Sequence, residues 1–147
     1  MKNLSFYHIP IAYMILFTLL ILGTGLWLFF LSQGSAGSEG LAATLVKVIQ
    51  SPEPKSLHNF IEVATPHMFA MGTLLFVVAH FMLFSTKISQ STALIVSMLL
   101  FLFMLFNIFS YGAISLGFIV SGWIKLLSMA LFVGMFLVLL FMVGVSL

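Results

Sequence analysis

The chain lacks cysteine, arginine and aspartate, and it carries few charges of either sign. Without cysteine it can form no disulfide, thiolate metal site, iron–sulfur cluster or covalent c-type haem attachment. Five lysines and three glutamates give a formal net charge of +2, which is far from the clustered basic face that nucleic acid binding needs. We therefore expect no nucleic acid partner. Histidine, methionine and glutamate are the remaining side chains that could bind a metal.

Apolar residues dominate what is present. They make up 63% of the 147 residues, whereas charged residues make up 5%, and no soluble core hides that much apolar surface. Four apolar segments approach or exceed the length that crosses a bilayer, at about residues 9–31, 63–84, 93–109 and 118–145. We predict an all-α transmembrane four-helix up-and-down bundle in the lipid bilayer, formed by a single integral membrane domain over residues 1–147.

The predicted connections are unequal. Residues 32–61 form one long loop between helices 1 and 2, with an amphipathic stretch at residues 41–49 followed by two prolines. The connections at residues 85–91 and 111–117 are short. The last three helices should therefore be antiparallel neighbours.

The first apolar segment has ends like those of a signal peptide. Its apolar run exceeds the 7 to 15 residues of a signal core, so we interpret it as a membrane helix. Four spans place both termini on one side. The long loop carries Glu39 and Glu53 and has the character of an exported loop, so we expect a bacterial inner membrane protein with both termini cytoplasmic.

Four histidines stand out in this apolar chain. A polar side chain at membrane depth indicates a functional site, and imidazole binds haem iron, copper and zinc. His8 and His80 fall in the leaflet on the terminal side, whereas His67 lies about one turn into helix 2 from the loop side, with His58 just outside the helix. The chain thus offers one pair of imidazoles per leaflet.

This arrangement resembles the membrane-bound dihaem b-type cytochromes, which have paired histidines near both faces of a small four-helix bundle. The resemblance rests on the bundle and on His8, His67 and His80. It implies a haem b held by His8 and His80, a second haem at His67, and electron transfer between a quinol or quinone pool and a partner redox protein. Bis-histidine ligation leaves iron no open position, which suits one-electron transfer. Other membrane or redox subunits are the implied partners.

The chain departs from that family in one respect. Ligands on one helix usually point to one side there, whereas 13 steps of about 100° turn His80 about 140° away from His67. The second ligand of the loop-side site is therefore open. It is His58 swung inward by a break at Pro66, a residue of another subunit, or no residue at all.

A polar cluster is expected on the loop side, if the bundle is antiparallel, from Glu62, Asn107, Ser110, Tyr111, Trp123 and Lys125. Glu62 is predicted to accept a proton from a bound quinol, and the alternative is a surface glutamate that stabilises the start of helix 2. Lys125 is predicted to pair with a haem propionate or with Glu62. Its alternative is a snorkelling lysine in an aromatic belt.

Two other functions remain open. The aromatic-rich helices fit a non-catalytic accessory subunit that packs on partners or lipid. His67 and Met71 lie one turn apart and form a nitrogen and thioether pair that copper(I) accepts, so a copper or other metal-handling membrane protein is the third possibility. The sequence has no Gly-rich phosphate loop, serine nucleophile elbow or paired carboxylates. An enzymatic role would therefore be that of an electron-transfer subunit in an oxidoreductase complex.

Overall fold

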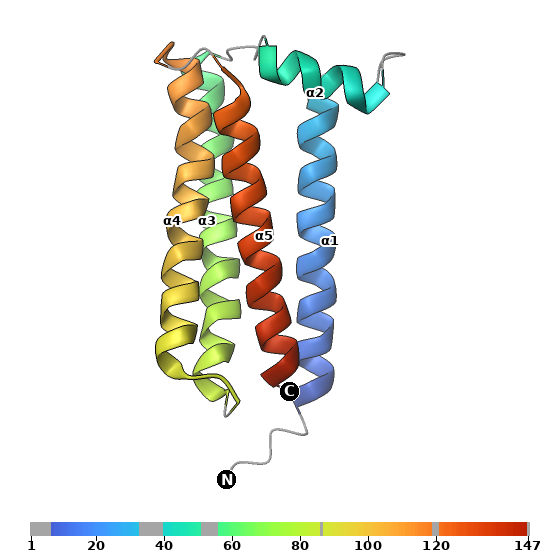
Figure 1. Ribbon diagram of the computed structural model, residues 1–147, viewed down its shortest axis with the longest axis vertical. Helices are drawn as coiled ribbons and strands as arrows, with labels where there is room; N and C mark the ends of the chain where they lie inside the picture. The colour runs from blue at the N-terminus through green and yellow to red at the C-terminus, as the bar shows by residue number, and fades with distance from the viewer. Residues whose placement is uncertain (1–6, 33–39, 51–55, 86, 119–120, 147) are drawn as a thin grey trace.

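The structure is a computed structural model that describes residues 7–32, 40–50, 56–85, 87–118 and 121–146. The helices are α1 (His8–Ser32), α2 (Gly40–Gln50), α3 (Leu57–Phe81) with the 3₁₀ turn η2 (Met82–Phe84), α4 (Gln90–Ser115) and α5 (Trp123–Ser146). All but α2 are long and apolar enough to span a membrane, counting α3 and η2 as one span. They run alternately up and down (Figure 1). The predicted all-α four-helix transmembrane bundle is confirmed.

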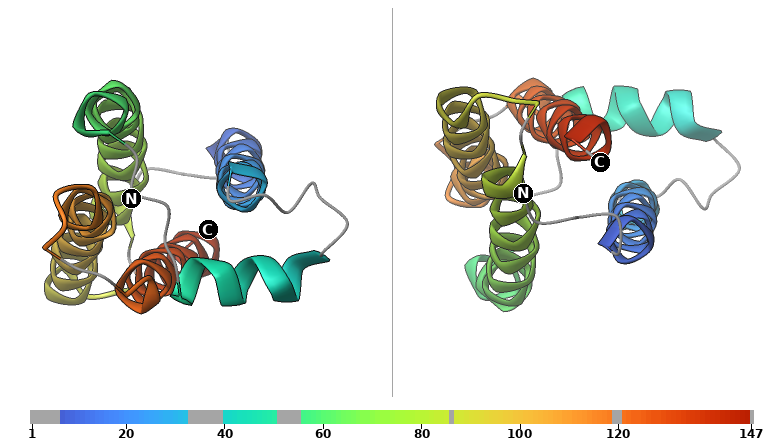
Figure 2. Two further views of the ribbon diagram at one scale, coloured as in Figure 1. Left: turned by 90° about the horizontal axis from the view of Figure 1, so that it is seen from above. Right: turned by 90° about the horizontal axis from the view of Figure 1, so that it is seen from below.

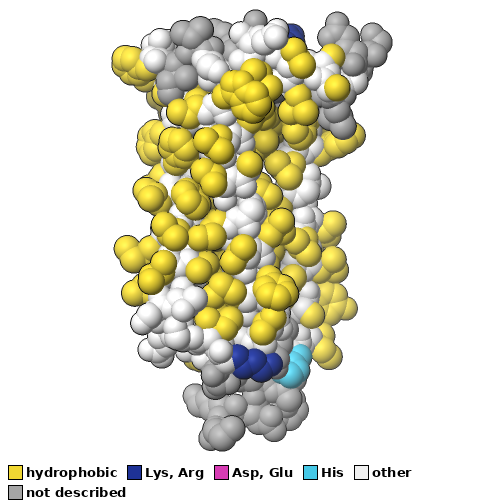
Figure 3. All heavy atoms as spheres, in the orientation of Figure 1, with side chains coloured by type: hydrophobic (Ala, Val, Ile, Leu, Met, Phe, Trp, Pro, Cys, Tyr) yellow, Lys and Arg dark blue, Asp and Glu magenta, His cyan; other side chains and the backbone are white. Residues whose placement is uncertain are grey.

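We call the end of the bundle where α1 begins and α5 ends the terminal end, and the opposite end the loop end. The surface between these two ends is apolar: Phe69, Phe76 and Phe141 are 78%, 63% and 72% exposed. Figure 3 shows hydrophobic side chains over the length of the visible face, with lysine near both ends and histidine near the terminal end. A surface of this kind is stable only against lipid, so the chain is an integral membrane protein.

Three of the spanning helices, α3, α4 and α5, form a closely packed core. Leu75 of α3, Leu100 of α4, and Phe136 and Leu139 of α5 are completely buried between them. Small buried serines on α4 and α5 let these two helices approach closely, as is usual between membrane helices.

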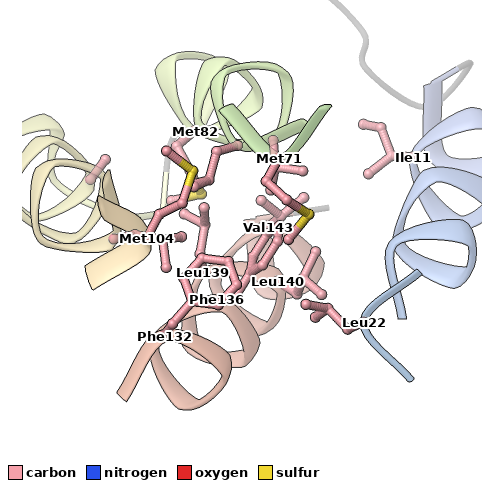
Figure 4. Close-up of a cluster of buried hydrophobic side chains, with 14 of the residues drawn as sticks. Ile11, Leu22, Met71, Met82, Met104, Phe132, Phe136, Leu139, Leu140 and Val143 are labelled. Carbon is pink, nitrogen blue, oxygen red and sulfur yellow. The ribbon is translucent and has the colours of Figure 1, made fainter. Parts of the chain in front are cut away.

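The first helix stands apart from this core (Figure 2). Its buried residues are Ile11, Thr18 and Leu22, all within the first 15 residues of the helix. Figure 4 shows Ile11 and Leu22 on the side of α1 that faces the core cluster. The last ten residues of α1, toward the loop end, contain no fully buried side chain.

The amphipathic stretch predicted in the long loop is the helix α2, which lies across the loop end of the bundle (Figure 1). Thr44 and Val48, four residues apart on one face, are buried. The backbone N–H of Gly122 donates a 3.2 Å hydrogen bond to the carbonyl oxygen of Ile49. A β-carbon on Gly122 would overlap the carbonyl oxygen of Val48. Glycine at this position therefore lets α2 rest directly on the start of α5.

We expect Gly122→Ala to displace α2 from the bundle. Because the clash is with backbone rather than with a flexible side chain, we expect a loss of about 1–3 kcal/mol, the usual range for overpacking. Thermal unfolding in detergent should show a lower midpoint. Gly134→Ala, in the middle of α5 with open space around its α-carbon, is the matched control and should keep or raise the midpoint. Equal midpoints for both variants would contradict the contact.

The predicted start of helix 2 was wrong. The helix begins at Leu57 rather than at residue 63, because the Ser56 side chain accepts a 3.3 Å hydrogen bond from the N–H of Asn59 and caps the helix there. Pro66 lies inside this helix without interrupting it. The predicted break at Pro66 is therefore also wrong, and His58 belongs to the same continuous helix as His67.

The boundaries of the third and fourth helices also differ from the prediction. The third helix was predicted at residues 93–109 and extends over Gln90–Ser115, since Ser89 caps its start through a 3.1 Å hydrogen bond from the N–H of Thr92. It ends before Gly117, whose φ of +76° is favourable only for glycine. The fourth helix was predicted from residue 118 and begins at Trp123. Tyr111 is consequently helical and does not lie in a connecting loop.

Candidate functional site

A cavity of about 680 Å³ lies between the loop-end halves of the four spanning helices. Its walls come from positions 21–32 of α1, 59–71 of α3, 107–111 of α4 and 125–133 of α5. The volume falls within the range of sites that bind cofactors and other small molecules. Most of the α1 wall of this cavity comes from the last ten residues of the helix, which contain no fully buried side chain.

Apolar side chains make up most of the wall, with Met71, Ile108 and Phe132 among them. Met71 and Phe132 lie on facing helices (Figure 4). The polar side chains on the wall include Asn59, His67, Asn107, Tyr111 and Lys125. A mainly apolar cavity with a few convergent polar groups is the usual form of a ligand site.

Lys125 is the cation of this cavity. It is partly buried, and its Nζ donates 2.8 Å hydrogen bonds to both the backbone oxygen and the side-chain Oδ1 of Asn107. The ammonium also lies 5.9 Å from the ring centroids of Phe29 and Tyr111, within the range of a cation–π contact. Residues of α1, α4 and α5 thus surround one charged group.

Two serines support the same place from inside the bundle. The Ser128 hydroxyl lies 3.4 Å from Asn107 Oδ1 and 2.9 Å from the backbone oxygen of Lys125. It also lies 3.0 Å from the Ser110 hydroxyl, which donates a 2.9 Å hydrogen bond to the Asn107 backbone oxygen. Asn107, Ser110 and Ser128 are all buried. The sequence correctly predicted that Asn107, Ser110, Tyr111 and Lys125 lie together.

The predicted loop-side pair of histidines is not brought together. His67 is on the cavity wall. His58 precedes it by nine residues on the same unbroken helix, so it points about 180° away and lies about 13.5 Å along the axis. His58 therefore cannot ligate a metal ion that His67 of the same chain ligates, and the pairing through a break at Pro66 is corrected.

The terminal-side pair, His8 and His80, is exposed on two different helices. The His80 ring lies 5.9 Å from Phe76 and 5.8 Å from Phe84, centroid to centroid. Among the described residues, no hydrogen bond or ring contact joins His80 to His8. Shared haem ligation by these two histidines stays a prediction.

Glu62 and Trp123 lie outside the cavity. Both side chains are exposed, and Glu62, the one glutamate within the described part of the chain, forms no ion pair with Lys125. The predicted pairing of Lys125 with Glu62 is therefore not observed, and a proton-accepting role for Glu62 stays a prediction. Within the described ranges, no group of three or more histidine, cysteine, aspartate or glutamate side chains gathers around a common point.

Sequence reasoning missed two features of the site. The cavity itself was missed because it depends on how far α1 stands from α3, α4 and α5. The direct hydrogen bonds of Lys125 to Asn107 were missed because they depend on which way each helix faces. Met71 lies on the wall with His67, so the nitrogen and thioether pair considered for copper faces the same space. The common depth of the polar residues was the signal that pointed to this place.

Comparison with known proteins identifies the family. A family of transmembrane helical domains, Aq_1264_TM, matches residues 35–147, which is most of the chain and includes α2 to α5. No curated protein and no solved structure matches the chain. The chain belongs to the Aq_1264_TM family of transmembrane helical domains.

Proposed function

We propose that this chain is a membrane electron-transfer subunit that holds haem b in the cavity and passes electrons between a quinone pool and a partner redox protein. The observation that carries the proposal is the convergence of His67 and Lys125 on one largely apolar cavity. Imidazole is a ligand of haem iron. An ammonium is the natural partner of a haem propionate.

The positions of the two side chains along their helices support the fit. His67 is ten residues into α3, whereas Lys125 is two residues into α5, so their α-carbons lie about 15 Å and 3 Å beyond the first residues of their helices. The imidazole therefore belongs to the deeper, apolar part of the bundle and the ammonium to the part near the loop end. A porphyrin has the same division between an apolar ring and a polar carboxylate edge.

Haem, when bound, supplies reversible one-electron chemistry at its iron. The chain's residues have simpler tasks. Met71, Ile108 and Phe132 exclude water, His67 ligates the iron, and Lys125 balances a propionate charge. His58 of the same chain could not act as a second ligand there, because it lies on the opposite side of α3 from His67. A second haem at His8 and His80, and a quinol whose proton passes to Glu62, extend the proposal to the other predicted residues.

The absorption spectrum of the purified protein tests the proposal. We expect a red protein with a sharp Soret band and, by pyridine haemochrome analysis, one haem b per chain for the cavity, rising to two if His8 and His80 hold another. Reduction by a quinol analogue should change the spectrum. A colourless protein, expressed with ample haem, would instead indicate the accessory subunit, and stoichiometric copper by elemental analysis would indicate metal handling.

A further inference from the structure

We infer that Asn107 is a positioning residue that fixes the Lys125 ammonium on the cavity wall, so that the cavity selects amphiphiles carrying a carboxylate. The inference rests on the proposed function where that carboxylate is a haem propionate. The same chemistry is offered by a long-chain fatty acid. It predicts which end of the ligand faces the loop end of the bundle and which chemical group is recognised.

The Lys125 ammonium is held at two points. Two hydrogen bonds of 2.8 Å run from Nζ to one residue, Asn107, through its backbone oxygen and its Oδ1. A long, flexible lysine side chain held at two points has lost most of its freedom to snorkel toward water. An ammonium has three N–H donors, so one more is available for an oxygen in the cavity.

Asn107 is itself held in one orientation by its neighbours. Its side chain is buried, and its Oδ1 faces both the Lys125 ammonium and the Ser128 hydroxyl. Its backbone oxygen receives the Ser110 hydroxyl as well as the ammonium. Asn107 therefore has one orientation that satisfies its neighbours, and this orientation determines where the charge of Lys125 lies.

The charge of Lys125 is not neutralised by the residues that hold it. Asn107, Ser110 and Ser128 are neutral, and they solvate the ammonium without neutralising it. Glu62, the described glutamate nearest in sequence to the cavity wall of α3, is exposed and does not pair with Lys125. Even near the end of the bundle, a partly buried positive charge is costly unless an anion or strong acceptors surround it. An anion in the cavity would complete the set around Lys125.

The shape of the cavity indicates the shape of a suitable ligand. The wall beyond Lys125 is apolar, including Met129, Phe132 and Val133 of the same helix. The cavity thus suits a molecule with a carboxylate at the loop end and an apolar body extending inward. A neutral molecule of the same shape would keep the apolar contacts and lose the contact with the ammonium.

The experiment compares haem with its dimethyl ester, in which both propionates are neutral. The full chain, produced in haem-deficient cells and purified in detergent, is titrated with each compound. We expect haem to bind at least about tenfold more tightly than the ester, because a hydrogen bond to a charged group is worth about 1.5–3 kcal/mol. Palmitate and methyl palmitate, measured by displacement of a fluorescent fatty acid, give a second ratio that does not depend on iron.

Four variants test which residues produce the preference for a carboxylate over its ester. Lys125→Met should bring both ratios close to one. Asn107→Asp keeps the shape and supplies an internal anion, so it should do the same while leaving Lys125 in place. Lys125→Arg retains a cation and should retain the preference. His67→Ala should weaken haem and its ester alike and leave their ratio unchanged, which separates iron ligation from carboxylate recognition.

The outcomes distinguish the two proposals. Failure of both haem compounds to bind, with palmitate still preferred over its ester in the wild type and not in Asn107→Asp, would support this inference and overturn the haem proposal. Tight haem binding with equal affinity for the ester would overturn the inference alone. A preference unchanged in both Lys125→Met and Asn107→Asp would overturn it too, with circular dichroism showing that each variant is folded.

Discussion

Replacing His67 with alanine is expected to remove the haem held in the cavity, lowering the haem content by about one per chain, while the chain stays folded in the membrane. His67 is on the cavity wall, and its exposed side chain has no part in the packed core. Its removal therefore costs the iron a ligand and costs the bundle little. Haem per chain, determined as the pyridine haemochrome, is the measurement.

The chain supplies a matched control for this variant on the same helix. His58 is also exposed but points about 180° away from His67, so His58→Ala should keep the full haem content of the cavity. His80→Ala should lower the haem content only if the terminal-side pair also binds haem. Full occupancy in His67→Ala would show that the cavity does not hold haem through this residue.

A second large effect is expected from Phe136→Ala, which should destabilise the bundle by about 3–5 kcal/mol. Phe136 is completely buried between α3, α4 and α5, and its ring lies 5.7 Å from that of Phe132, centroid to centroid. Packing rather than water exclusion holds membrane helices together. The void left by the ring is therefore the main cost, and unfolding by sodium dodecyl sulfate measures it.

Phe141→Ala is the control for this substitution. It lies on the same helix and removes the same number of atoms, but its side chain is 72% exposed and would face lipid. Lipid chains can fill the space that the missing ring leaves, so stability should change by well under about 1 kcal/mol. Equal losses in the two variants would mean that Phe136 does not pack as the structure shows.

The spans could be predicted from the sequence because long apolar runs have one stable environment, the bilayer. Their ends were less predictable. Residues 57–62 include His58, Asn59 and Glu62, which suggest a loop, yet they form the first turns of α3 because Ser56 caps it. Capping is a local hydrogen bond that a composition window does not detect.

The polar cluster could be predicted only in part. The depth of a residue along an antiparallel bundle follows from its residue number. It could therefore be predicted that Asn107 and Lys125 lie close together. The direction in which each helix faces depends on packing against its neighbours. For this reason the second ligand of the loop-side site stayed open in the sequence, and neither the pairing of His58 with His67, one of its alternatives, nor that of Lys125 with Glu62 is observed. The separation of α1 from the other three spanning helices (Figure 2) leaves no periodic signal in a helix that is apolar on all sides.

The uneven packing of α1 has a mechanical consequence. Ile11, Thr18 and Leu22 hold the first 15 residues of α1 to the core, while its last ten residues form much of one cavity wall, whose outer side would face the acyl chains of one leaflet. Lateral pressure from the acyl chains in that leaflet would oppose outward movement of this part of α1. We therefore expect the width of the cavity to depend on the thickness and saturation of the surrounding lipids, with the contacts of Ile11, Thr18 and Leu22 as the fixed part of α1.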